Sequence, residues 1–216
     1  MAQRDGKIST FIIERNTPGI TVTPIKGLLA GRGAYIGEIE FDEVVVPEEN
    51  MIGKEGEGFV YVVNTALDSG RYSIAWAGLA IAQESLNAMV KYARERSQFG
   101  KKIYNYQAIQ SIIADAVVRV HAANALCEKA AKLRDDKHDD AVIETINAKY
   151  FTSKIAMQIA TDAVQVHGGN GCCNEYPVER MFREAKILEI IEGSTQIQQE
   201  IISRFGLRRY YRINSK

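Results

Sequence analysis

The sequence lacks most of the features that mark a specialised class of protein. Its 216 residues carry no net charge, with 27 basic and 27 acidic side chains, which argues against a surface for nucleic acid or an anionic membrane. Its three cysteines have neither the number for a disulfide framework nor the spacing of a zinc site. No apolar run approaches the roughly 20 residues that span a bilayer. We therefore predict a globular cytoplasmic protein with no metal site, no membrane span and no nucleic-acid partner.

The first fifty residues carry β-strand patterns. Residues 8–13 and 20–25 are rich in β-branched side chains, and residues 38–46 begin with strict alternation. Asp5-Gly6 is a strong hairpin-turn dipeptide, yet only four residues precede it. We therefore expect the partner strand of this hairpin to be missing, because the chain is a fragment or another chain supplies the strand. The alternative is a flexible start in which Asp-Gly is incidental.

From about residue 58 the apolar period becomes helical. The pattern predicts three long helices, the first closing before residue 100 and the others spanning 107–134 and 140–167. A shorter helix is predicted at 178–190, and a last one after Gly193, where Thr195 and Gln198 can form a capping box. These elements predict a mainly α protein. A partial β domain, residues 1–53, would precede an antiparallel helical bundle, residues 54–216.

The sharpest local feature is Glu192, which follows the apolar residues 187–191 and precedes a glycine, two hydroxyls and a helix start. A carboxylate in apolar surroundings has a raised pKa and can act as a general base. The neighbouring helix start offers free N–H groups to a polarised oxygen. The alternative is an ordinary glutamate that stabilises the helix dipole, and this local pattern alone favours that alternative.

Two further segments could hold a ligand. Residues 94–100 end a helix with two arginines, a Phe and a Gly, which could grip a phosphate and stack on a ring, or could merely favour the helix dipole. Residues 165–171 are glycine-rich, which allows close backbone approach to a ligand but is also typical of a helix C-cap. His167 in this segment is expected to make a backbone hydrogen bond rather than bind a metal.

Taken together, these segments resemble the acyl-CoA dehydrogenase family over almost the whole chain. The motifs are residues 45–50 with Gly53, then 68–71, 94–100, 107–110, 165–171, 176–180, 183–187 and 192–198. The resemblance implies an FAD enzyme that desaturates an acyl thioester: a carboxylate removes the α proton while the β hydrogen leaves as hydride.

By position Glu192 resembles the family's base. In one branch the base stands instead at the place held here by Gly70, which cannot serve. Arg71 matches an arginine beside the active site, expected to orient base or substrate. The substrate-binding residues that the resemblance implies are Asp68, Ser69, Gly70, Arg71 and Gly193.

The family builds its FAD site from two subunits, so the resemblance also implies a homo-oligomer. The cofactor-binding residues that it implies are Arg96, Gln98, Phe99, Gln107, Gln165, Val166, His167, Gly168, Gly169, Ser194, Thr195 and Gln196. Residues 170–174 depart from the family's usual aromatic run and look more like relatives that act on carrier-protein-tethered acyl groups. The expected substrate is therefore an acyl-CoA or an acyl-carrier protein, with a separate electron acceptor for the reduced flavin.

The resemblance starts partway into the family's middle β domain. We therefore expect dehydrogenase activity to be incomplete without an N-terminal half, which a complementary chain could supply. The alternative is a non-catalytic assembly protein that keeps the family's helical oligomer interface. Retention of Glu192, Arg71 and Arg96 together favours the enzyme.

Overall fold

The computed structural model describes residues 1–214 and divides into two compact units, Met1–Ser69 and Gly70–Lys216. The boundary falls inside the first long helix, because α1 (Asn64–Glu95) begins in one unit and continues through the other. The domain division at residue 53 stays a prediction. Among the described residues, no helix is both long and apolar enough to cross a membrane.

The first unit contains two small antiparallel sheets. One has the strand order β1 (Ala2–Arg4), β2 (Lys7–Phe11), β5 (Met51–Ile52), and the other pairs β3 (Ile20–Pro24) with β4 (Gly37–Phe41). The predicted strands lie in these places, but β4 ends at Phe41. Residues 44–46 are not a strand, because the chain runs through Pro47 into a 3-10 turn, η1 (Glu48–Asn50).

Asp5-Gly6 does form a two-residue hairpin turn, with φ of 50° and 75°. The expectation that its partner strand is missing is wrong. Residues 2–4 form that strand, with Arg4 paired to Lys7 and Ala2 to Ser9. Three residues are enough here, because a two-residue turn with positive φ at both positions sets the strands directly into register.

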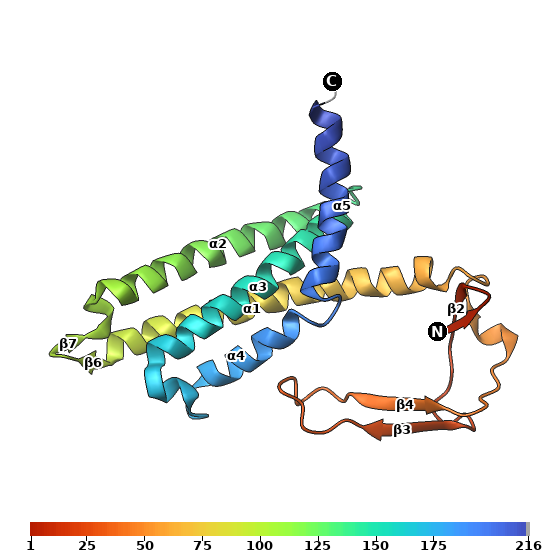
Figure 1. Ribbon diagram of the computed structural model, residues 1–216, viewed down its shortest axis with the longest axis horizontal. Coiled ribbons are helices and arrows are strands. Elements are labelled where there is room, and N and C mark those ends of the chain that lie inside the picture. The colour runs from red at the N-terminus through yellow and green to blue at the C-terminus, as the bar shows by residue number, and fades with distance from the viewer. Residues whose placement is uncertain (215–216) are drawn as a thin grey trace. The chain divides into compact units, whose positions relative to one another are not determined.

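The second unit is the antiparallel bundle that the sequence predicts (Figure 1). After α1 come α2 (Gln107–Asp135), α3 (Ala141–His167), α4 (Pro177–Leu188) and α5 (Thr195–Asn214). A π-helical turn, η2 (Gly58–Val63), leads into α1 from the first unit. In the figure α1 to α4 lie along one another, whereas α5 leaves the bundle at a steep angle.

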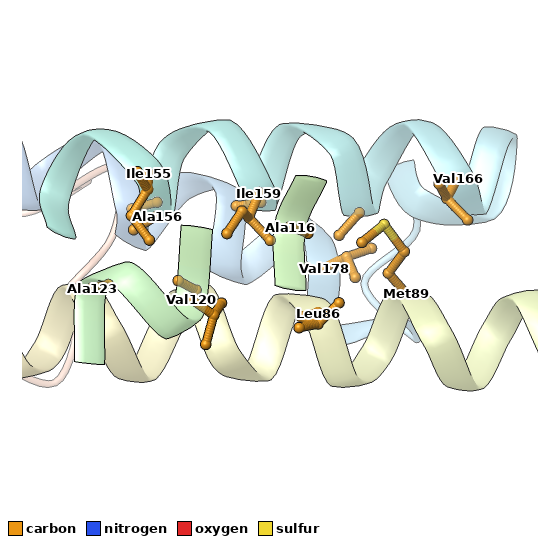
Figure 2. Close-up of a cluster of buried hydrophobic side chains, with 14 of the residues drawn as sticks. Leu86, Met89, Ala116, Val120, Ala123, Ile155, Ala156, Ile159, Val166 and Val178 are labelled. Carbon is orange, nitrogen blue, oxygen red and sulfur yellow. The ribbon is translucent and has the colours of Figure 1, made fainter. Parts of the chain in front are cut away.

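Small side chains let the helices approach closely around α3. The core shown in Figure 2 joins Leu86 and Met89 of α1 to Val120 of α2, Ile159 of α3 and Val178 of α4, with buried alanines between them. Alanine and glycine at contact positions bring helix axes together. A Cβ built on Gly78 of α1 would lie 2.8 Å from the Thr152 hydroxyl of α3. This close packing of α1 on α3 also fixes the position of Lys149, which lies one helical turn before Thr152.

A short hairpin connects α1 to α2. Its strands are β6 (Ser97–Gln98) and β7 (Lys101–Lys102), and the turn residues Phe99 and Gly100 have φ of 50° and 83°. A 3-10 turn, η3 (Ile103–Asn105), then leads into α2. At the end of α3 a second one, η4 (Gly168–Cys172), follows Gly168 at φ 59°, so the glycine-rich stop of this helix is confirmed.

Candidate active site and cofactor-binding regions

Glu192 lies on the connection between α4 and α5, in a left-handed backbone conformation. Its φ is 53° and that of Gly193 is 90°. A non-glycine residue in this region carries a backbone cost of about 1–2 kcal/mol, and such residues cluster at functional sites. The two successive positive φ values turn the chain sharply, so the half-buried Glu192 side chain is presented where α4 has ended and α5 has not begun.

The surroundings of Glu192 are polar rather than apolar, contrary to the sequence-based expectation. Ile190 and Ile191, which suggested an apolar environment, are 58% and 39% exposed. They point away because α4 ends at Leu188, so the helical pattern that would bury them does not continue. The groups that pack against the turn instead come from α1, α3 and α5.

Two fully buried side chains hold the turn by its carbonyls. Lys149 of α3 donates from Nζ to the carbonyl oxygen of Gly193 at 2.6 Å. Gln198 of α5 donates from Nε2 to the carbonyl oxygens of Glu192, at 3.1 Å, and Gly193, at 3.2 Å. The chain reversal therefore rests on buried polar contacts, each of which costs free energy if it is left unmade.

The carboxylate of Glu192 lies against α1 at Gly70. A Cβ built on Gly70 would overlap both the Oε2 atom and the Cδ atom of Glu192. The two positions that the family resemblance connects with the base thus face the same space. Only one of them can carry a side chain there, and in this chain it is Glu192.

Arg71, the next residue of α1, is 8% exposed. Its Nε atom has no hydrogen-bond partner within residues 1–214, and the same holds for Oε1 of Gln198. A buried donor and a buried acceptor without partners are rare in native proteins and call for a ligand or water. Both side chains adjoin Gly193, since a Cβ built there would lie 3.8 Å from Arg71 Nε.

Lys149 is a buried cation among other charges. Burial is the main cause that lowers its pKa to about 8, and the nearby charge of Arg71 lowers it further. The carboxylates of Glu192 and Glu189 act in the opposite direction and raise it. At neutral pH Lys149 is therefore still mostly protonated, and the site contains two cations beside the glutamate.

The start of α5 differs from the predicted capping box. The Ser194 hydroxyl accepts from the Ile197 N–H at 3.5 Å, while the Thr195 N–H and hydroxyl both donate to the Glu189 carbonyl, at 2.9 and 3.2 Å. Gln198 cannot complete a box because its amide is turned inward to the carbonyls of the turn. Ser194 and Thr195 are half-buried, whereas Gln196 is exposed.

A second group of predicted ligand residues lies on and around the hairpin between α1 and α2. Arg96, Gln98 and Gln107 are exposed, and Phe99 at the tip is 92% exposed. The hairpin is tied down by the Tyr106 hydroxyl, which donates to the Gln98 carbonyl at 2.8 Å. An ordered hairpin with a highly exposed phenyl ring at its tip and an exposed arginine at its base suits contact with another molecule.

The glycine-rich segment lies at the same end of the bundle. His167 is buried, stacks on Tyr92 of α1 at a centroid distance of 4.1 Å, and contacts the Ala163 carbonyl through Nδ1 at 2.7 Å. The expected backbone hydrogen bond is thus confirmed. Burial lowers the pKa of the His167 imidazole, an effect that the Ala163 contact partly offsets. Asn170 then donates to the hydroxyls of Tyr92 and Tyr176, at 3.0 and 3.1 Å.

This network leaves only part of the segment available to a ligand. Val166 and His167 face the core, whereas Gln165, Gly168 and Gly169 are exposed. A Cβ built on either glycine would meet nothing within 4 Å. Open space in front of two rigidly supported glycines fits close approach of a ligand backbone or phosphate.

The two groups of residues are far apart within one chain. Lys149, beside Glu192, and His167, beside the hairpin, are 18 residues apart on α3, which corresponds to about 27 Å along a helix. No single pyrophosphate can contact both groups. Gly70, Arg71, Glu192 and Gly193 come together; Asp68 and Ser69 precede them on α1, in the first unit.

Comparison with known proteins decides the family. The model of the acyl-CoA dehydrogenase C-terminal domain matches residues 56–207. The chain belongs to the acyl-CoA dehydrogenase family. Cyclohexane-1-carbonyl-CoA dehydrogenase of Geobacter metallireducens is 41% identical, over 91% of this chain and 51% of the relative. Subunit CarC of the caffeyl-CoA reductase-Etf complex of Acetobacterium woodii is 39% identical, over 94% and 53%.

Among solved structures, PigA with FAD and proline has a TM-score of 0.87 at 28% identity, over 93% of this chain and 52% of that chain. The chain spans about half the length of the curated relatives it matches. FAD is the cofactor of the family. The exposed Arg96 and the open glycines at one end of the bundle fit contact with a dinucleotide, and the unpartnered atoms beside Gly193 offer a second, separate place for contact with a ligand.

Proposed function

We propose that this chain carries the catalytic base and many of the cofactor-binding residues of an FAD-dependent dehydrogenase, which forms the α,β double bond of an acyl thioester. The observation that supports this most strongly is the Glu192 carboxylate. It is held on a left-handed turn against Gly70, with Arg71 and Lys149 adjoining the turn. In this proposal Glu192 takes the α proton as the Cα–H bond breaks, and the electron pair enters the new double bond. FAD supplies the acceptor for the β hydride.

The residues around Glu192 have separate roles in this proposal. Arg71 orients the base or the thioester through its unpartnered Nε–H, which is buried and therefore directional. Gly193 keeps the turn free of a side chain, since a Cβ there would press on the Gln198 amide. Asp68 and Ser69 are proposed to line the substrate site because they precede Gly70 on α1.

The cofactor-binding residues are proposed to act on two different FAD molecules. Ser194, Thr195 and Gln196 adjoin the base and would contact the flavin used by the same chain. The other group would reach the flavin of a neighbouring subunit, because it lies about 27 Å away along α3. That group comprises Arg96, Gln98, Phe99, Gln107 and Gln165 to Gly169. Val166 and His167 support its backbone from within the core.

The substrate is proposed to be an acyl-CoA. The two curated relatives described above are named for CoA thioesters, at 41% and 39% identity. An acyl-carrier protein remains the second candidate, because residues 170–174 depart from the usual family run. An electron-transfer flavoprotein is the proposed acceptor, since CarC is a subunit of a complex with Etf. A homo-oligomer and a cytoplasmic location stay predictions.

A direct test of the function is product formation. Purified protein, with the N-terminal half of a relative supplied in cis or in trans, is loaded with FAD and incubated with saturated acyl-CoA and an artificial electron acceptor. The expected product is a 2-enoyl-CoA, lighter by two hydrogens. The chain alone is expected to hold FAD weakly and to turn over little. An FAD-loaded protein that converts neither acyl-CoA nor acyl-carrier protein would favour the non-catalytic assembly role.

The proposed role of Arg96 in FAD binding can be tested separately. Arg96→Ala is expected to weaken FAD binding by about 10- to 100-fold, through loss of a charge-assisted phosphate contact. Arg94→Ala is the matched control, because Arg94 is also an exposed arginine at the end of α1. Unaltered flavin affinity of Arg96→Ala in the titration would leave Arg96 as a helix-dipole partner only.

A further inference from the structure

Lys149 is the most unusual side chain of the bundle. It belongs to a stripe of α3 that is entirely shielded from solvent, together with Thr145, Thr152, Ala156 and Ile159. A lysine is almost never fully buried unless a partner compensates its charge. No salt bridge of Lys149 occurs within residues 1–214, and its one hydrogen bond runs to the Gly193 carbonyl at 2.6 Å.

One hydrogen bond to a carbonyl does not compensate the free energy that burial of a cation costs. Desolvation of the ammonium is the largest influence on its proton affinity, and it is unfavourable to the charged form. The Arg71 cation adds repulsion, so only the carboxylates of Glu192 and Glu189 favour the charge. A methionine in this place would fill the same volume without that cost, as it does when buried ion pairs are replaced. Stability therefore does not account for Lys149.

The position of its hydrogen bond, at the Gly193 carbonyl, explains why a lysine is present here. The Gly193 carbonyl directly follows Glu192, whose left-handed conformation must be maintained against a backbone cost. We propose that Lys149 is a positioning residue for Glu192: its ammonium holds the Glu192–Gly193 turn through the Gly193 carbonyl and places a positive charge beside the base. This inference rests on the proposed role of Glu192 as base, and it adds a residue that acts through Glu192 rather than on the substrate.

Gln198 shares the same carbonyl but not the same role. Its amide contacts both carbonyls of the turn from α5, at 3.1 and 3.2 Å, and it carries no charge. The shorter contact of 2.6 Å comes from the ammonium, as is usual for charge-assisted hydrogen bonds. Removal of Lys149 is therefore expected to loosen the turn while Gln198 keeps it from unfolding.

The test compares Lys149→Met with Lys154→Met, the matched control, because these are the two lysines of α3, and Lys154 donates to the Tyr150 hydroxyl rather than to the Glu192–Gly193 turn. Backbone amide exchange is followed without flavin or substrate. The reporters are the amides of Thr195 and Gln198, which donate to the Glu189 and Ser194 carbonyls. Lys149→Met is expected to speed exchange at both by about tenfold, as loss of one charged hydrogen bond predicts. Amide exchange in the rest of α3 should not become faster, and the unfolding midpoint at pH 7 should not decrease.

In the FAD-loaded protein the same variant is expected to slow flavin reduction by acyl-CoA by at least about tenfold, and Lys154→Met to leave it unchanged. Lys149→Gln, which is also uncharged and one atom shorter, provides the second variant if the methionine protein does not fold. Unchanged exchange at Thr195 and Gln198, or equally faster exchange along all of α3, would overturn the inference. Failure of the proposed function is separate, because it is judged on Glu192 variants and not on amide exchange.

Discussion

Gly70 and Glu192, 122 positions apart in the sequence, occupy the two sides of one contact: the absent side chain of the glycine leaves the space that the glutamate carboxylate fills. This contact joins α1 to the turn before α5. It explains why a glycine is tolerated inside a long helix, where it normally weakens the helix by about 1 kcal/mol relative to alanine.

Gly70→Ala is expected to separate stability from activity. Alanine favours the helix, but its Cβ must displace the carboxylate, so flavin reduction by acyl-CoA should slow by about tenfold or more while the unfolding midpoint is unchanged or higher. Gly206→Ala is the control, since a Cβ there meets nothing within 4 Å in α5. Unaltered flavin reduction in Gly70→Ala would show that the carboxylate position does not matter.

The shared space also predicts that the carboxylate can be moved. Glu192→Gly alone should abolish proton abstraction and also stabilise the turn by about 1 kcal/mol, because glycine adopts a φ of 53° without the Cβ penalty. Adding Gly70→Glu should restore part of the flavin reduction. The free energy of unfolding and the rate of flavin reduction can be measured by denaturant unfolding and by rapid mixing, on the wild type, the Glu192→Gly variant and the double variant. No recovery in the double variant would contradict a common site for the two positions.

His167 predicts acid lability at the C-terminal end of α3. Its folded pKa lies below the ordinary value of 6.5 because the ring is buried against Tyr92. The unfolded chain therefore binds more protons below pH 6.5, and stability falls as the pH is lowered through 6.5 towards the folded pKa. His167→Phe keeps the stacked ring and should remove this component. The measurement is the unfolding midpoint between pH 5 and 7.5, and parallel curves for both proteins would refute the assignment.

Lys149 predicts a second pH dependence of the same sign, at alkaline pH. The folded state releases this proton near pH 8 and the unfolded state only near pH 10.5, so stability from this group rises as the pH increases between those values. A difference of that size corresponds to about 3 kcal/mol of burial cost below pH 8. Lys149→Met should therefore exceed the wild type in unfolding free energy at pH 7, and the gap should narrow by about 2 kcal/mol at pH 9.5.

The sequence predicted the bundle well because each helix is long and strongly periodic: residues 107–134 and 140–167 were expected, and helices occupy Gln107–Asp135 and Ala141–His167. It failed where short-range and long-range contacts compete. A three-residue strand before Asp5-Gly6 is too short to recognise by pattern.

The sequence predicts an apolar environment for Glu192 because the residues that precede it are apolar, but residues adjacent in sequence are not its neighbours in space. Its actual partners come from Gly70, Lys149 and Gln198. The sequence does single out Lys149. It is the one charged residue on the buried stripe of α3, whose other members are apolar or carry a hydroxyl. A charge on a buried stripe indicates a polar site but does not identify its partner.

The most direct test of the central claim is a single-turnover experiment on the Glu192→Gln variant. The FAD-loaded assembly is mixed with acyl-CoA in the absence of oxygen, and loss of the oxidised flavin absorbance is followed. Glutamine keeps the size of the side chain but has no basic oxygen, so FAD binding should be retained and flavin reduction should slow by about 10²- to 10⁴-fold. Reduction within a few-fold of the wild-type rate, at equal flavin content, would contradict the assignment of Glu192 as the base.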